Sequence, residues 1–195
     1  MTKHHLILGL APALALAACG GNTTTNATTG DMTGMNMEDM NMTDEANATT
    51  NMAAQVSPAQ QFANDVAASD QYEIEAGKLA QEKAQSQGLK DFGALMVSEH
   101  TKSSDKLKTA GNAANPAIIP APTLTAEQEA NLAALRNAEG AAFDAAYKTQ
   151  QTAAHEKALA LVQGYAASGD VPELKSFAGE AQKMVQEHLT KIRSL

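Results

Sequence analysis

The sequence predicts an all-α protein: a four-helix bundle of two antiparallel helical hairpins, with an extra short helix in the long connection between helices two and three. Alanine is abundant, whereas valine, isoleucine and aromatic residues (4% of the chain) are scarce, which favours helix over sheet. Apolar residues also recur at helical spacing. One pattern of leucine, phenylalanine, methionine and histidine occurs over residues 89–100 and again over residues 174–188. A repeated helix with an inward histidine indicates two hairpins, with any chemistry between them.

Composition divides the 195 residues into a signal peptide (1–18), a Met/Asn/Thr-rich tether (19–56) and a helical domain (57–195). The apolar run over residues 6–18 is too short to span a membrane and follows Lys3, as in an export signal. It ends in a Leu-Ala-Ala-Cys sequence that resembles a bacterial lipobox, and Cys19 is the only cysteine. We expect Cys19 to be lipidated; the alternative is a plain secretory signal with an incidental cysteine. Gly20 resembles the pattern of lipoproteins sent to the outer membrane, which predicts the envelope of a Gram-negative bacterium, facing the periplasm.

The formal charge of −8 bears on the partners of the protein. An acidic protein is repelled by phosphate groups, so we expect no nucleic-acid partner and no attraction to an anionic membrane surface. Contact with the membrane is expected through the lipid at Cys19, and protein partners would be other envelope proteins. Cationic partners, metal ions included, stay open.

The tether lacks the apolar bulk to form a core, and we expect it to be a flexible leash between the lipid and the domain. It holds five closely spaced methionines: Met32, Met35, Met37, Met40 and Met42. Thioethers are soft ligands that suit Cu(I) or Ag(I), and such clusters resemble those of periplasmic copper-handling proteins. The alternatives are low-complexity drift and a sacrificial site of oxidation.

The first hairpin is expected to begin at Ser57, an N-cap followed by proline at the first helical position. Gly88 is expected to end the first helix, with the second starting at Leu89 and stopping at Gly111 and Asn112. So short a link makes the two helices antiparallel.

The second half of the domain follows an extended, proline-rich connection over residues 115–122. Thr125 and Gln128 form a capping-box pattern that opens the short extra helix. A break near Gly140 is expected to start the third main helix, over about residues 141–167, and Pro172 lies in the first turn of the fourth. On the third helix we expect Phe143, Tyr147, Ala154, Ala158, Leu161 and Tyr165 on the core side.

Each main helix offers one metal-ligating residue near its core face. Helical spacing places Glu73, His100 and His188 inward, and His155 on a stripe at the edge of the core side. Imidazole and carboxylate are ordinary ligands of Fe, Zn, Mn or Cu, and four-helix bundles often build metal sites from facing side chains. Spacing alone does not say whether all four reach one level. A smaller set of Glu73, His100 and His188, with His155 hydrogen-bonded elsewhere, stays open.

Several enzyme classes lack their signatures. The Glu-x-x-His pattern of di-iron bundles is absent, because Val97 and Val185 stand three residues before the two repeat histidines. The chain has no phosphate-binding glycine loop and no Ser-His-Asp spacing, and its one thiol is the expected lipidation site.

A family resemblance covers residues 57–195. Phe62, residues 73–80, Phe92, residues 96–101 and 140–147, with the later histidines, resemble the bacterial family called domain of unknown function 4142. The resemblance implies a ferritin-like bundle in an exported, envelope-located protein. The motif positions that it carries over are Glu73, His100, Asp144, Tyr147, His155 and His188. The family usually has Asp where this chain has Glu99, and we expect Glu99, Asp144 and Tyr147 to support the metal ligands from behind.

Three functions compete at this point. The first is a lipid-anchored envelope protein whose bundle binds a transition-metal ion for buffering or stress protection. The second is a non-enzymatic interaction or structural module without metal, in which buried polar residues only set the register of the helices. The third is an enzyme that uses the same cluster, which needs an open coordination position and a substrate pocket.

Overall fold

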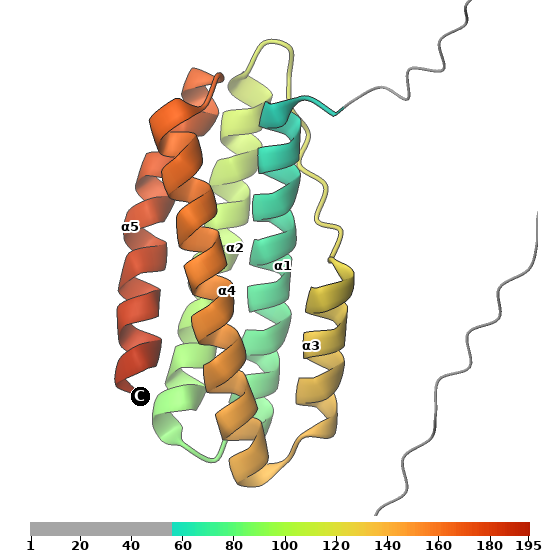
Figure 1. The fold of residues 1–195 in the computed structure, drawn as a ribbon, viewed down its shortest axis with the longest axis vertical. Coiled ribbons are helices and arrows are strands. Elements are labelled where there is room, and N and C mark those ends of the chain that lie inside the picture. Colours follow the sequence, from blue (N-terminus) through green and yellow to red (C-terminus); the bar gives the residue numbers. More distant parts are fainter. Residues whose placement is uncertain (1–55) are drawn as a thin grey trace, which may run out of the picture. The chain divides into compact units, whose positions relative to one another are not determined.

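A computed structural model describes residues 56–195, which form five helices (Figure 1). The helices are α1 (Pro58–Lys83), α2 (Gln87–Ala113), α3 (Ala126–Asn137), α4 (Gly140–Ser168) and α5 (Pro172–Ser194). The described part of the chain contains no strand, which confirms the all-α prediction. None of its helices combines the length and the apolar character that a membrane crossing needs.

Some predictions lie outside the described residues. They are the signal peptide, the lipidation site at Cys19 and the tether with its methionine cluster over residues 32–42. These predictions stand on the sequence alone.

The four long helices lie side by side, and α3 lies outside them (Figure 1). α1 contacts α2 and α4, α5 contacts the same two helices, and each contacting pair runs antiparallel (Figure 1). α3 packs against α1 and α4. The connection before α3, together with α3, returns the chain to the end where α2 began, so α2 and α4 run in the same direction. This arrangement leaves one interior shared by four helix faces.

Local signals set the helix starts as predicted. The Ser57 hydroxyl accepts a hydrogen bond from the Gln60 backbone N–H at 3.1 Å, with Pro58 in the first turn. Thr125 and Gln128 form the reciprocal capping box. Gly140 has a φ of 57°, a left-handed conformation that suits glycine, and it ends the short link between α3 and α4.

The predicted end of α1 at Gly88 is wrong, and α2 ends one residue after the predicted stop at Gly111 and Asn112. α1 ends at Lys83, and Gly88 lies in the first turn of α2. α2 also continues through Gly111 to Ala113. Gly111 serves a close approach: its carbonyl accepts the Ile118 N–H at 2.9 Å, and a Cβ there would lie 2.3 Å from the Ile118 carbonyl oxygen. A glycine that permits a tight contact looks the same in sequence as one that ends a helix.

The core consists of two apolar clusters separated by a polar layer. The Phe62 cluster includes Phe62, Val66, Leu107, Val162, Leu174 and Phe177, at the end where α1 begins. The Phe92 cluster includes Leu89, Phe92, Met96, Phe143, Tyr147 and Ile192, at the other end. Between the two along the helices lies the polar layer, defined as the buried residues Asp70, Glu73, His100, Gln151, His155 and His188. Any chemistry in the interior is concentrated in this layer.

Candidate metal centre

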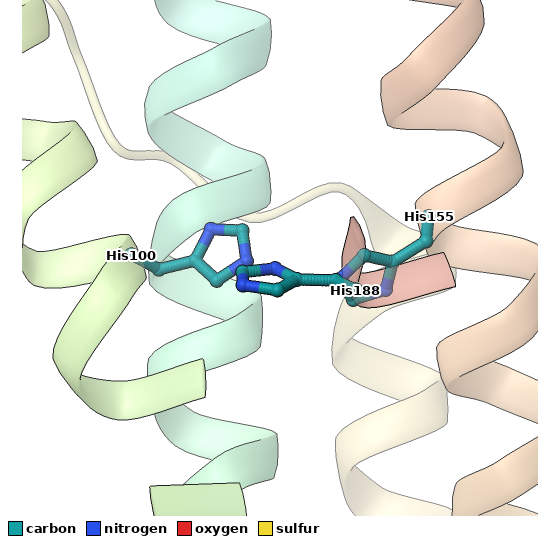
Figure 2. A group of neighbouring side chains, drawn as sticks. All are labelled: His100, His155 and His188. Atoms are coloured by element: carbon teal, nitrogen blue, oxygen red, sulfur yellow. The ribbon is translucent and has the colours of Figure 1, made fainter. Parts of the chain in front are cut away.

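Three histidines from three helices converge in the polar layer (Figure 2). His100 comes from α2, His155 from α4 and His188 from α5, and each is 4% exposed or less. One ring nitrogen of each lies within 4.8 Å of those of the other two. The ring centroids are 5.4–5.8 Å apart. The three histidines therefore lie at the same height along the bundle, which helical spacing alone did not establish.

Hairpin geometry explains why these side chains meet. In an antiparallel pair, residues equally far from the connecting link lie at the same height. The distance from His155 to the α4–α5 link and the distance from this link to His188 differ by less than one helical turn. Asp70 and His100 lie equally far from the α1–α2 link, counted back from Lys83 and forward from Gln87.

Asp70 orients the histidine on α2. Its Oδ1 is 2.7 Å from Nδ1 of His100, and both side chains are buried. The Ser104 hydroxyl donates to Oδ2 of Asp70 at 3.2 Å. This carboxylate holds the proton of His100 on Nδ1 and leaves Nε2 free to bind a metal. Burial opposes the charged form of His100, but the hydrogen bond and charge of Asp70 outweigh it and raise the pKa.

His155 is oriented by its own helix. Its Nδ1 lies 2.9 Å from the carbonyl oxygen of Gln151, to which it donates, and 3.8 Å from Oε1 of Glu73. Burial lowers the pKa of His155. Burial, together with the charges of the other two histidines, also lowers the pKa of His188 to about 3. Both imidazoles are therefore neutral near pH 7, the form that binds a metal ion.

Glu73 brings a carboxylate to the same layer, but it is not in the group of three whose ligand atoms all lie within 4.8 Å of one another. It is buried, and its Oε2 has no hydrogen-bond partner in the protein. Among the described residues, every buried side-chain N or O atom without a protein partner belongs to this layer or to Tyr147 beside it. These atoms are Glu73 Oε2, His100 Nε2, Tyr147 Oη, Gln151 Nε2 and Oε1, His155 Nε2 and His188 Nδ1. Buried polar atoms rarely lack partners, so their concentration at one place indicates a site for a cation or ordered water.

The interior face of α4 differs from the prediction. Phe143 and Tyr147 are buried as expected, but Gln151 and His155 are buried with them, whereas Ala154 and Ala158 are only half-buried. Alanines lie on several faces of α4, so the hydrophobic pattern of this helix does not define one apolar face. The two large aromatic rings of Phe143 and Tyr147, one turn apart, pack into the core and fix the rotation of the helix. Gln151 and His155 follow at the same four-residue spacing, so they face inward as well.

The three predicted supporting residues lie in different surroundings. Glu99 pairs with Lys102 at 2.9 Å. Asp144 accepts the Gln85 and Ser86 N–H groups at 3.0 and 3.1 Å and so fastens the α1–α2 link. Neither makes a hydrogen bond to a histidine. Tyr147 does adjoin the polar layer: burial and the charge of Glu73 raise the pKa of its hydroxyl.

Sequence reasoning missed Asp70 and did not select Gln151 as a site residue. Phe62, Val66 and Asp70 are spaced by four residues, so helical periodicity places Asp70 on the inward face. Its equal distance from the link with His100 is the second signal. Gln151 stands four residues before His155, which makes it a neighbour on the same face.

The chain matches the family described as Domain of unknown function (DUF4142) over residues 41–195. It belongs to this family. The match confirms the resemblance predicted from the motifs, and it begins 16 residues before the predicted domain boundary at residue 57.

One similar solved structure is described as CopM in the Cu(I)-bound form. It has 18% sequence identity and a TM-score of 0.58, and the likeness covers 70% of this chain and 93% of CopM. The likeness shows a shared helical fold. A search of the curated proteins found no match.

Proposed function

We propose that this protein binds a transition-metal ion in the polar layer of a ferritin-like four-helix bundle and that it buffers metal or protects against metal stress in the cell envelope. One observation carries the proposal. The buried side-chain atoms that lack protein partners gather around three converging histidines, and one of these atoms is Oε2 of Glu73 in the same layer.

The proposed ligand atoms are the unpartnered ones: Nε2 of His100, Nε2 of His155 and Nδ1 of His188. Glu73, outside the group of three in this structure, would be a fourth ligand after a movement of its side chain. Nitrogens bound to one ion at about 2 Å lie roughly 3–4 Å apart. One ring nitrogen of each histidine already lies within 4.8 Å of the other two, so small rotations of the rings would bring three nitrogens to this spacing. Asp70 behind His100 and the Gln151 carbonyl behind His155 supply the hydrogen bonds that metal-binding histidines usually have.

Copper is the ion that we favour over Fe, Zn and Mn. Imidazole donors suit copper and zinc, whereas a site for Mn is usually richer in carboxylates and water. The structural neighbour is in a Cu(I)-bound form, which supports copper in this fold. The methionine cluster over residues 32–42, if the tether samples soft ions as predicted, would serve the same metal.

Binding rather than catalysis is favoured by the size of the interior space. The cavity beside His100 measures about 20 Å³. That space admits one water molecule or one ion and no organic substrate. We therefore consider an enzyme the least favoured of the three functions.

The envelope location rests on the sequence. A lipid at Cys19 would anchor the protein to the outer membrane, with the domain in the periplasm. Substituting Cys19→Ser should move the protein from the membrane fraction to the soluble periplasmic fraction. Unchanged fractionation of this variant would contradict the lipid anchor and leave the metal site untouched.

The test of metal binding is the copper and zinc content of the full chain by mass spectrometry, after purification without chelators. Three chains are compared: the natural one, a His100→Ala/His188→Ala variant, and a matched control in which the five clustered methionines of residues 32–42 become leucine. We expect the control to retain one interior ion per chain and the histidine variant to lose it. Equal content in the natural chain and the histidine variant would contradict the shared site.

A second candidate is the metal-free interaction module. The contact between Asp70 and His100 Nδ1 favours it, because these two buried groups pair without a metal and would by themselves set the register of α1 and α2. Absence of metal from all three chains, after exposure to copper and zinc, would support this function instead.

A further inference from the structure

Two cavities meet in the seam between α2 and α5. The outer cavity, about 120 Å³, is bordered by the exposed side chains of Lys106 and Glu180. The inner one, about 20 Å³, reaches Asp70 and His100. Both are lined by the same three residues, Ser103, Ala181 and Met184. These three residues therefore stand between the cavity at the surface and the cavity that reaches the polar layer.

Met184 has the longest side chain of the three residues that line both cavities. Ser103 and Ala181 are small and buried, so they leave room between α2 and α5 that a partly exposed Met184 fills. Met184 stands one turn before His188 on α5, and Ser103 stands nearly one turn after His100 on α2. Residues at these spacings are neighbours on a helix face. An ion bound at Met184 would therefore lie close to His188 and His100.

The mouth of the outer cavity does not attract cations by charge. Lys102 pairs with Glu99 at 2.9 Å, and Lys106 pairs with Glu180 at 2.9 Å. The two lysines and two glutamates offset one another. The distinctive group at the mouth is instead the thioether of Met184, a soft, polarisable ligand on a flexible side chain.

We propose that Met184 is an entry ligand: its Sδ binds a soft monovalent ion, Cu(I), at the seam and passes it to His188 and His100. This inference rests on the proposed metal site and adds the route and the selectivity of loading. No redox step is involved, since the ion keeps its charge and exchanges a thioether ligand for imidazole nitrogens.

The chain offers a matched control and an internal probe. Met96 is the other methionine among the described residues, and it is fully buried in the Phe92 cluster, away from the seam. All three tyrosines lie in the helices, with Tyr147 beside the polar layer, and the tether contains none. Tyrosine fluorescence therefore reports arrival of copper in the interior beside Tyr147.

The experiment is stopped-flow tyrosine fluorescence on the full chain, mixed with Cu(I) or with Zn(II), for the natural protein, Met184→Leu, Met184→Ala and Met96→Leu. We expect Met184→Leu and Met184→Ala to slow Cu(I) loading about tenfold, with unchanged final stoichiometry. Zn(II) loading should be unchanged in every variant, and Met96→Leu should load Cu(I) at the natural rate.

Three results would overturn the entry role. They are natural Cu(I) loading in Met184→Leu, faster loading in Met184→Ala, which would make Met184 a steric plug, and equal slowing of Zn(II). A natural chain that binds neither ion would overturn the metal site itself, so the two failures are distinguishable.

Discussion

The polar layer and the apolar clusters on either side of it are equally buried but differ in how well their atoms are satisfied. In the Phe62 cluster, rings stack and cross, as Phe62 does with Tyr165 and Phe177. In the polar layer, five of the six residues have side-chain atoms without a partner, and the sixth, Asp70, pairs with His100. Unpartnered buried groups cost stability, so the flanking clusters hold together a layer that does not favour folding by itself. The comparison teaches that burial alone does not separate a core from a site, whereas the pairing of polar atoms does.

The largest expected effect comes from removing the ring where the two regions meet. Phe92 is fully buried, with ring centroids 6.1 Å from His155 and 6.3 Å from His188. Phe92→Ala should lower the free energy of unfolding by about 3–5 kcal/mol, because it removes apolar area and leaves a cavity. Urea denaturation of the metal-free protein measures this loss. A cost below about 1 kcal/mol would mean that the Phe92 cluster does not support the layer.

Metal should reverse the cost of the layer. Copper at one hundred times its dissociation constant is expected to stabilise the folded protein by about 2.7 kcal/mol, because it binds only the folded state. Thermal unfolding with and without copper measures the change in Tm. In the histidine double variant this stabilisation should disappear. The same increase in Tm in that variant would locate the stabilising ion elsewhere.

Acid should weaken the metal-free protein through two of the histidines. Burial lowers the pKa of His155 and of His188, the latter to about 3, so below pH 6.5 the unfolded chain binds protons that the folded chain does not. The stability that these neutral imidazoles provide is present above about pH 6.5 and is lost as the pH falls. For His188 the loss is about 2 kcal/mol between pH 6.5 and 5.

The contribution of His100 to stability changes with pH in the opposite direction. Its raised pKa gives a contribution that is complete below about pH 6.5 and lost as the pH rises through the folded value. Urea denaturation at a series of pH values tests both signs, with His188→Leu as the control that should flatten the acid slope. An unchanged slope in that variant would show that the acid sensitivity arises in other groups.

The smallest expected effect is that of replacing a layer histidine with an apolar side chain in the absence of metal. His188→Leu removes the unpartnered Nδ1 and keeps the interior filled, so the free energy of unfolding near pH 7 should change by less than about 1 kcal/mol. Metal binding should be lost in the same variant. A loss of more than 3 kcal/mol in the metal-free form would show that His188 is satisfied within the protein, and the contrast with the apolar clusters would fail.

Prediction from sequence succeeded where the controlling interactions are local. Ser57 and Thr125 cap their helices with groups three residues away, and Gly140 marks the break by its own backbone conformation. It failed where a distant segment decides. Gly111 depends on Ile118, and the rotation of α4 depends on which neighbours receive Phe143 and Tyr147.

The candidate site divides in the same way. Glu73, His100 and His188 were predicted to point inward, because a single face of one helix determines that direction. Asp70 went unselected, although its spacing was readable, because its role exists only through a histidine on another helix.

The sequence by itself determined the helical class, the family and the presence of one metal-ligating side chain on each long helix. These properties follow from composition and from periodicity within single segments. Only the tertiary structure decided that three histidines stand at one level, that Asp70 and Gln151 orient two of them, and that Met184 lines the cavity beside His100. Each of those facts depends on the relative height and rotation of helices, which packing between distant segments sets.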